Sequence, residues 1–192
     1  IMGVEEVVED KTHLIKRLET ESRQHYSLLE QAYTKLEDYP DMSQEKCFES
    51  ALGLVLTWVN RILFLKLLES QLKDFNNNND DTFLDELHIK DYDVLHDLFL
   101  KVLAKPLAER NQVLKEQFPN VPYLNSSLFE LSKLEQEFIP VSGIRLGNMT
   151  IYEHTVLKDG KGRRITGEMS TLQYLLRFLD AYDFGTEHNV DN

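Results

Sequence analysis

The segment Asn120-Val121-Pro122-Tyr123 has residue types that could hold a nucleobase. In an Asn-Pro-Pro-Tyr loop, the Asn side chain and a proline carbonyl accept hydrogen bonds from the exocyclic amine, while the aromatic ring stacks on the extruded base. Here Val121 stands in place of the first proline, and no strand with a glycine-rich turn precedes the segment to cradle an adenosyl cofactor. Because short motifs often arise by chance, we interpret this segment as a structural turn.

A second candidate is the Asp159-x-Lys161 pair within "VLKDGKGR", which matches the acidic-x-Lys half of a metal-dependent nuclease site. That chemistry needs further carboxylates to hold Mg²⁺, with the lysine near the attacking water. Glu153 is the only nearby acid on the preceding predicted strand. Since Asp-Gly between strand-like residues is a strong hairpin signal, we favour a turn and keep the nuclease as the weakest alternative.

The same segment carries the only dense run of basic residues, Lys158, Lys161, Arg163 and Arg164. Such a patch could contact DNA phosphates, although most short charge clusters are simply solvated. The six histidines are scattered and form no His-x-x-x-His pair, which is the spacing of a zinc-binding helix. We therefore expect no catalytic, cofactor-binding or metal-binding residue in this chain.

Asn60 and Arg61 form the most interesting polar pair, because they interrupt the most apolar segment of the chain, "ALGLVLTWVNRILFLKLL" (51–68). Buried Arg and Asn side chains need partners to offset their desolvation. We therefore expect both residues to be hydrogen-bonded within the fold or to face a cleft. The polar interruptions also favour a buried helix over a membrane span.

The composition describes one ordinary globular domain of 192 residues and 22.5 kDa. A formal net charge of −12 makes a self-sufficient nucleic-acid binder improbable, so any DNA contact must come from a local patch. The only cysteine, Cys47, favours a reducing, cytoplasmic setting. The N-terminus lacks the layout of a signal peptide, and the start at Ile1 indicates either a fragment of a longer protein or a residue left from a tag.

Periodicity predicts a mainly α fold, a helical bundle-like domain with a small β-hairpin or meander near 144–167. Within a single domain of residues 1–192, we expect 1–137 to be helical, 138–168 to form the β insertion and 169–184 the final helix. The expected helices are an amphipathic one over 11–37, a central one from the Ser43 N-cap to Leu72, short ones over 82–104, and others over 107–117, 128–137 and 170–182. Asp91 starts one of the short helices, and a capping box opens the last at Ser170.

Four ordered motifs resemble the helical segment of type IIG restriction–modification enzymes, which fuse an endonuclease to an adenine-specific DNA methyltransferase. We number them in chain order and keep these numbers below: "VNRILFLKLLE" (first motif, 59–69), "DYDVLHDLFLKVLAKPLAERN" (second, 91–111), "VPYLNSSLFE" (third, 121–130) and "TLQYLLRFLDAYDF" (fourth, 171–184). They resemble that family's Asn-Arg-x-x-Phe-Leu helix, its next helix pair, its Pro-Tyr-Leu-Asn-Gly-Gly-Leu-Phe-Glu signature and the helix before its methyltransferase core. Ser126-Ser127 replaces the glycine pair of the signature, which bears on the geometry of that turn.

The resemblance implies a connector domain that positions nuclease and methyltransferase domains of the same polypeptide on DNA. The S-adenosylmethionine and Mg²⁺ sites of such a parent enzyme would lie outside these residues, so this chain would hold no cofactor. The motif residues Asn60, Arg61, Tyr123, Leu124, Asn125, Phe129 and Glu130 would be structural, with Tyr123 and Phe129 as packing anchors and Asn125 capping or bridging the turn before Leu128. The alternative is a free-standing helical protein-interaction module.

Overall fold

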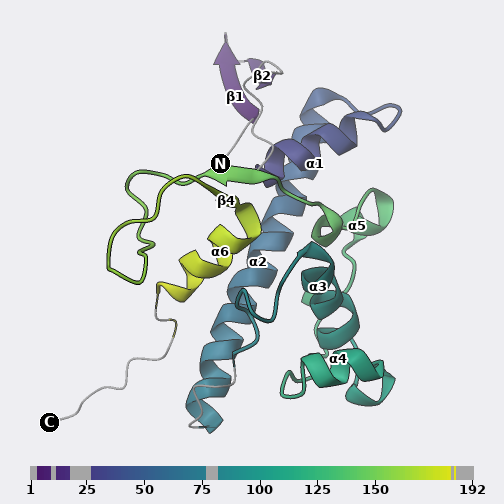
Figure 1. The fold of residues 1–192 in the computed structure, drawn as a ribbon. Helices are drawn as coiled ribbons and strands as arrows, with labels where there is room; N and C mark the ends of the chain where they lie inside the picture. The colour runs from purple at the N-terminus through teal and green to yellow at the C-terminus, as the bar shows by residue number, and fades with distance from the viewer. Residues whose placement is uncertain (1–3, 10–11, 18–26, 77–81, 183, 185–192) are drawn as a thin grey trace, which may run out of the picture.

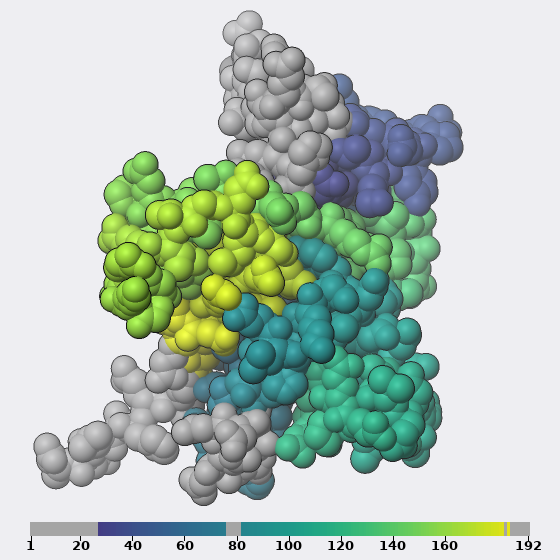
Figure 2. Space-filling view, viewed as in Figure 1, coloured from purple at the N-terminus to yellow at the C-terminus, as the bar shows by residue number. Residues whose placement is uncertain are grey.

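The computed structural model describes residues 4–9, 12–17, 27–76, 82–182 and 184. They form a mainly helical fold with small antiparallel β pairings, as the sequence predicted (Figure 1). The long helix α2 runs through the middle of the molecule, and the other helices are arranged around it (Figure 1). In the view of Figure 2, segments after residue 82 cover most of α2, with the green-to-yellow segment 144–182 on the left.

The N-terminal region differs from the prediction. Strands β1 (Val4–Glu9) and β2 (Thr12–Arg17) form an antiparallel hairpin in which Val4 lies opposite Arg17. The predicted amphipathic helix over 11–37 is therefore wrong at 12–17 and is confirmed at α1 (Leu28–Glu37), while its part at 18–26 lies outside the described residues. β1 contains three valines, whose branched side chains favour the extended conformation. β2 pairs with this strand, and a helical pattern read within 11–37 alone does not include that pairing.

Helix α2 (Gln44–Asn76) starts where predicted, because the Ser43 side chain accepts a hydrogen bond from the backbone N–H of Lys46 at 3.2 Å. It continues four residues beyond the predicted end at Leu72. By length and composition α2 could cross a membrane. However, its charged side chains Arg61, Lys66 and Glu69 are buried against other parts of this chain, as in the central helix of a globular fold.

After α2, the helices are shorter than the periodicity predicted. Helix α3 (Tyr92–Asp97) begins where the acidic segment predicted a helix start; the Asp91 side chain caps it, and it continues into the wider turns of η2 (Leu98–Leu103). The predicted helix 107–117 is divided into η3 (Leu107–Glu109) and α4 (Gln112–Gln117), because Arg110 is extended and the Asn111 side chain caps α4. Similarly, the predicted helix 128–137 becomes η4 (Ser127–Phe129) and α5 (Lys133–Glu137), since Ser132 and Glu135 form a capping box that starts a new helix.

The β insertion is confirmed, although its strands begin and end a few residues later than the predicted 144–167. After the turn η5 (Val141–Gly143), strand β3 (Asn148–Thr150) pairs antiparallel with β4 (Glu168–Ser170), so Met149 lies opposite Met169. Helix α6 (Thr171–Asp180) follows directly. The capping box predicted at Ser170 is wrong, because the Ser170 side chain makes no capping hydrogen bond; the Thr171 hydroxyl donates instead to the Gly147 carbonyl at 2.6 Å.

One buried apolar cluster connects these elements. Its fully buried members come from α1, α2, α3, η2, η4 and α6, and they include Leu36, Leu54, Leu65, Leu95, Phe99, Phe129 and Leu176. The core therefore lies along one side of α2, between this helix and its neighbours.

Candidate functional site

Arg61 is fully buried on α2 and bonds four acceptors. Its Nε donates to the Leu128 carbonyl at 2.7 Å, and Nη2 donates to the Glu130 carbonyl at 2.7 Å. Both terminal nitrogens also donate to the Glu135 carboxylate, at 2.8 and 2.7 Å. The guanidinium lies 5.7 Å from the centre of the Phe99 ring. The prediction that Arg61 is paired inside the fold is confirmed, and we call this group the Arg61 junction.

Glu135 completes the junction from α5. Its carboxylate also accepts hydrogen bonds from the backbone N–H groups of Ser132 at 2.9 Å and Val141 at 3.2 Å. Burial alone would raise the pKa of this carboxyl, but the hydrogen bonds from Arg61 and Ser132 outweigh burial and lower the pKa below its ordinary value. The Glu135 carboxylate is therefore ionised at neutral pH and hydrogen-bonded to Arg61.

The remaining residues of the first and third motifs lie in different surroundings. Asn60, which was expected with Arg61 to be hydrogen-bonded within the fold or to face a cleft, is exposed, because a one-residue step around a helix turns a side chain by about 100°. Phe129 is fully buried between Phe64 and Phe99, with ring centres 5.7 and 6.1 Å away, and is a packing anchor as predicted. Glu130 contributes its carbonyl, while its residue surface is exposed.

The third motif is also bonded to the second. Arg110, which is 4% exposed, donates to the Val121 carbonyl at 2.8 Å, and the Leu124 N–H donates to the Leu103 carbonyl at 2.9 Å. These bonds hold residues 121–124 as an ordered connecting segment, which agrees with interpreting Asn120–Tyr123 as a turn.

The expectation for Tyr123 is wrong, because Tyr123 is 42% exposed and is no packing anchor. Asn125 was expected to cap or bridge the turn before Leu128, and its side chain bridges residues 123 and 125 by accepting the Tyr123 hydroxyl at 3.2 Å. The cap itself comes from Ser126, whose hydroxyl accepts the Leu128 N–H at 3.2 Å. Ser126 stands where the signature of the resembled family has glycine, so its hydroxyl supplies a contact that glycine cannot make.

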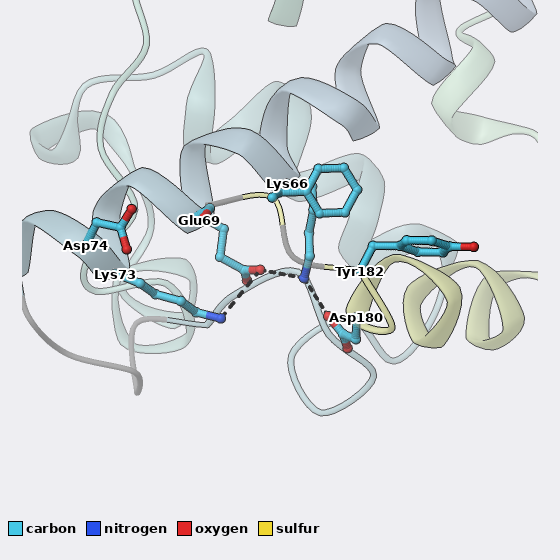
Figure 3. Close-up of a pocket in the computed structure, with 8 residues that line it drawn as sticks. Lys66, Glu69, Lys73, Asp74, Asp180 and Tyr182 are labelled. Atoms are coloured by element: carbon cyan, nitrogen blue, oxygen red, sulfur yellow. Dashed lines mark hydrogen bonds and ion pairs between the residues drawn. The ribbon is translucent and has the colours of Figure 1, made fainter. Parts of the chain in front are cut away.

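A second buried charge group joins α2 to α6 (Figure 3). Lys66 is 6% exposed, and its Nζ donates to Glu69 at 2.7 Å and to Asp180 at 2.5 Å. The other oxygen of Glu69 accepts the backbone N–H groups of Phe83 at 2.7 Å and Leu84 at 2.8 Å. We call these side chains, Lys66, Glu69 and Asp180, the Lys66 cluster.

The Lys66 cluster borders a cavity of about 360 Å³, also lined by Lys73, Asp74 and Tyr182 (Figure 3). A lysine acts as a nucleophile when its pKa is lowered. Burial would lower the pKa of Lys66, but the hydrogen bonds to Asp180 and Glu69 outweigh burial and raise the pKa. The ammonium is thus held charged and occupied, and the arrangement supports a structural role in fixing α6 and residues 83–84 to α2.

The basic run forms an exposed hairpin at 158–164, in which Lys158 pairs with Arg164. Asp159 closes its turn by accepting the N–H groups of Lys161 and Arg163, both at 2.9 Å, and it pairs with the Arg163 side chain at 2.8 Å. Backbone and side-chain hydrogen bonds from Arg163 lower the pKa of Asp159. Among the described residues, Lys158, Lys161 and Arg164 have no ion-pair partner, which leaves three cations directed to solvent.

The nuclease alternative requires Glu153, Asp159 and Lys161 to share a metal-binding centre. Asp159 is instead occupied by the turn and by Arg163. Among the residues that the structure describes, no group of three His, Cys, Asp or Glu side chains could hold a metal ion. The hairpin interpretation of Asp159-Gly160 therefore describes this segment.

Sequence reasoning missed the partners of the buried charges. Glu135 was visible only as part of the capping-box pattern Ser132-x-x-Glu135, and Asp180 as an acid at the end of an amphipathic helix. The pairing of Lys66 with Glu69 could have been predicted, since two opposite charges three residues apart within an apolar helix can pair on one face. Which loops receive them depends on tertiary contacts that spacing does not encode.

The chain was compared with known proteins. No curated protein matches it, and no solved structure matches it either. A family model described as "Domain of unknown function (DUF7814)" matches residues 1–192. Because this match spans the entire sequence, the chain belongs to the DUF7814 family.

Proposed function

We propose that this chain is a helical connector domain of a type II restriction–modification enzyme. It packs against the nuclease and methyltransferase domains of the same polypeptide and helps to position both on DNA in the cytoplasm. It has no catalytic centre of its own, and the parent enzyme supplies the sites for S-adenosylmethionine and Mg²⁺. The proposal rests on the resemblance of four ordered motifs to that enzyme class.

The observation that supports the proposal is that these four motifs bond one another. Arg61 of the first motif holds two carbonyls of the third motif, at Leu128 and Glu130. The second motif holds the third through Arg110 and Leu103. Lys66 of the first motif holds Asp180 of the fourth. Residues that fix one interior arrangement explain why the motifs occur together, and a rigid interior is what a connector needs to set the positions of two flanking domains.

The test is the gene on both sides of residues 1–192, together with the purified chain. We expect nuclease acids upstream, and downstream a cofactor-binding glycine motif followed by an Asn-Pro-Pro-Tyr loop. Isothermal titration of the purified chain with S-adenosylmethionine should show no binding, and incubation with DNA should give neither methylation nor cleavage. Measurable S-adenosylmethionine binding, or a reading frame that stops near Asn192, would contradict the connector function.

A second candidate function is a free-standing helical module that binds another protein. Exposed apolar residues on α2, including Leu56 at 54% exposure, favour it, because isolated domains rarely leave a row of such residues uncovered. The reading frame discriminates between the two candidates: a natural stop near Asn192 selects the module, whereas continuation into a methyltransferase core selects the connector.

A further inference from the structure

Helix α2 has an exposed apolar row on one side. We call it the α2 seam; its members are Leu52, Leu56, Val59, Leu63 and Leu67, and they are between 36% and 54% exposed. At about 100° per residue, these five side chains fall within a sector roughly 80° wide, on the side of the helix away from Arg61. The seam is therefore continuous along about four turns of the helix.

The spacing of the seam matches helix-to-helix contact. Its members follow one another at intervals of four, three, four and four residues, which is close to the repeat that lets one helix lie along another. Scattered exposed leucines need no explanation, but a contiguous apolar row marks an interaction surface.

A cavity adjoins the seam at Val59. It has a volume of about 400 Å³ and lies between α2, β3 and α6, with Trp58, Met149, Tyr174 and Phe178 in its lining. Interfaces gain most of their affinity where a large apolar side chain enters such a recess. The seam together with this cavity can therefore receive a helix that carries one bulky apolar anchor.

The charges that extend the seam are of one sign. Glu45 and Glu49 precede Leu52, and Asp74 follows Leu67; all three are exposed and fall in the same sector of α2. Of the described α2 residues in that sector, these three carry all the charge, so both ends of the seam are acidic. A partner with basic residues at its ends is complementary to this surface.

We propose that the α2 seam binds an amphipathic α-helix of a partner protein, with a matching apolar row, Lys or Arg at its ends, and a bulky apolar side chain that enters the cavity beside Val59. This proposal does not depend on the restriction–modification assignment, because it rests only on α2 and α6. It specifies which side chains a partner should carry, whereas the four motifs do not.

Charge disfavours a second copy of the chain as the occupant. An antiparallel pair centred between Val59 and Asn60 would place Leu52 opposite Leu67, but it would also place Glu45 opposite Asp74. A parallel pair would place each acid opposite itself, and the net charge of −12 adds general repulsion. A membrane is disfavoured for the same reason, since the lipid surfaces of cells are anionic.

Two synthetic helical peptides test the proposal. Both carry the same leucine row with one central Trp, and their ends carry Lys in one peptide and Glu in the other. We expect the purified chain to bind the Lys peptide at least about tenfold more tightly than the Glu peptide, by fluorescence anisotropy of a dye attached to each peptide. Equal affinity for both peptides, or no binding of the Lys peptide, would overturn the proposal.

Variants of the chain locate the contact. The double variant L56E/L63E should reduce affinity for the Lys peptide by about tenfold or more, because it places charge in the centre of the seam. The matched control L107E/V113E changes two apolar residues that are at least as exposed but lie off the seam, and it should leave affinity unchanged. The variant E45K/E49K should reverse the preference between the two peptides. Equal losses in the seam and control variants would place binding elsewhere and overturn the proposal.

The other occupants are tested with the same variants. Sedimentation should give a monomer, and the chain should not float with vesicles of phosphatidylcholine and phosphatidylserine. A dimer that L56E/L63E dissociates would assign the seam to a second copy, and flotation that this variant abolishes would assign it to a membrane surface; either result overturns the proposal. An unchanged thermal midpoint for L56E/L63E confirms that the variant remains folded.

Discussion

Arg61 joins three separate parts of the chain in the interior. It neutralises Glu135 and satisfies the carbonyls of Leu128 and Glu130, which precede α5 and have no strand to pair with. A lysine could not reproduce this, because only a planar guanidinium offers forked donors to a carboxylate and to two carbonyls at once. The residue thus fixes one particular path of the chain between η4 and α5.

Replacing Arg61 with Ala should reduce the free energy of unfolding by about 3–5 kcal/mol, because it leaves the buried Glu135 carboxylate without its cation. Urea unfolding followed by circular dichroism measures the change. Asn60→Ala is the matched control, since its neighbouring side chain is exposed, and it should change stability by less than about 0.5 kcal/mol. Similar effects of the two variants would show that the Arg61 junction contributes little to stability.

The junction also predicts a dependence on pH. Because the pKa of Glu135 is lower in the folded state than in the unfolded chain, its ionisation stabilises the fold above the unfolded pKa, and this stabilisation is lost as the pH falls through the folded value. Wild type should therefore exceed Glu135→Gln in stability at pH 7, and the difference should shrink towards pH 3. Urea unfolding of both proteins at several pH values measures this. A difference that stays constant across the range would contradict the assigned ionisation.

At the scale of elements, local capping signals predicted boundaries well where side chain and backbone alone decide. Ser43 caps its helix as expected, the acids from Asp91 onward indicated a helix start, and the strand-like composition after residue 144 indicated the β insertion. Periodicity predicted the wrong boundaries where a capping residue starts a new helix. Asn111 caps α4, although the apolar pattern predicts one continuous helix over 107–117. The capping box predicted at Ser170 does not form, and the side-chain hydrogen bond at this helix start is made by Thr171, which donates to the Gly147 carbonyl.

The sequence predicted that Arg61 is paired but not which residue pairs with it, because the partner is set by tertiary contacts. An arginine within an apolar helix must be paired, so Arg61 could be identified from its surroundings in sequence. Its partner Glu135 lies 74 residues away, and no spacing rule links the two. Asn60 shows the opposite case, since a polar residue in an apolar segment can also lie on the exposed side, and sequence alone does not orient the helix.

The Lys66 cluster makes an element-scale prediction. Glu69→Ala removes the acceptor of two backbone N–H groups and leaves Lys66 with Asp180 alone. The free energy of unfolding should therefore fall by about 2–6 kcal/mol, at about 1–3 kcal/mol for each unsatisfied buried donor. Hydrogen exchange at Phe83 and Leu84 should accelerate. Asp74→Ala, in the same cavity but exposed, is the control and should leave both measurements unchanged. Unaltered exchange in Glu69→Ala would mean that other contacts hold residues 83–84.

The structure of the hairpin at 158–164 shows which of its basic residues are available to contact DNA phosphates. Arg163 is committed to Asp159, whereas Lys161 and Arg164 have no ion-pair partner among the described residues. In the parent enzyme, K161A/R164A should weaken binding to all DNA sequences alike and reduce the slope of log affinity against log salt by about 0.9 for each phosphate that is no longer neutralised. Lys133→Ala, an exposed cation on α5, is the control. Unchanged affinity at several salt concentrations would remove the hairpin from the DNA interface.

At the scale of the whole molecule, charge and apolar surface are separated. The basic hairpin lies between β3 and β4, and the α2 seam ends in acids, while the chain as a whole carries a net charge of −12. The net charge disfavours the approach of a polyanion, and because exposed charges more than about 8 Å apart are largely screened at physiological ionic strength, only the few cations of the hairpin itself attract DNA there. Any DNA contact by the hairpin therefore needs other domains to bring the DNA close.

The isolated chain should accordingly bind duplex DNA weakly. With a fluorescent duplex of about 20 base pairs at about 0.15 M salt, we expect a dissociation constant above about 10⁻⁴ M, which is weaker than the usual range for non-specific DNA binders. Anisotropy measures the constant, and K161A/R164A should not change it, because binding is already lost to the overall repulsion. A micromolar constant that this variant raises would show that three exposed cations outweigh the net charge. In that case the chain would be a DNA-binding domain in its own right, and the connector would contact DNA without help from its neighbours.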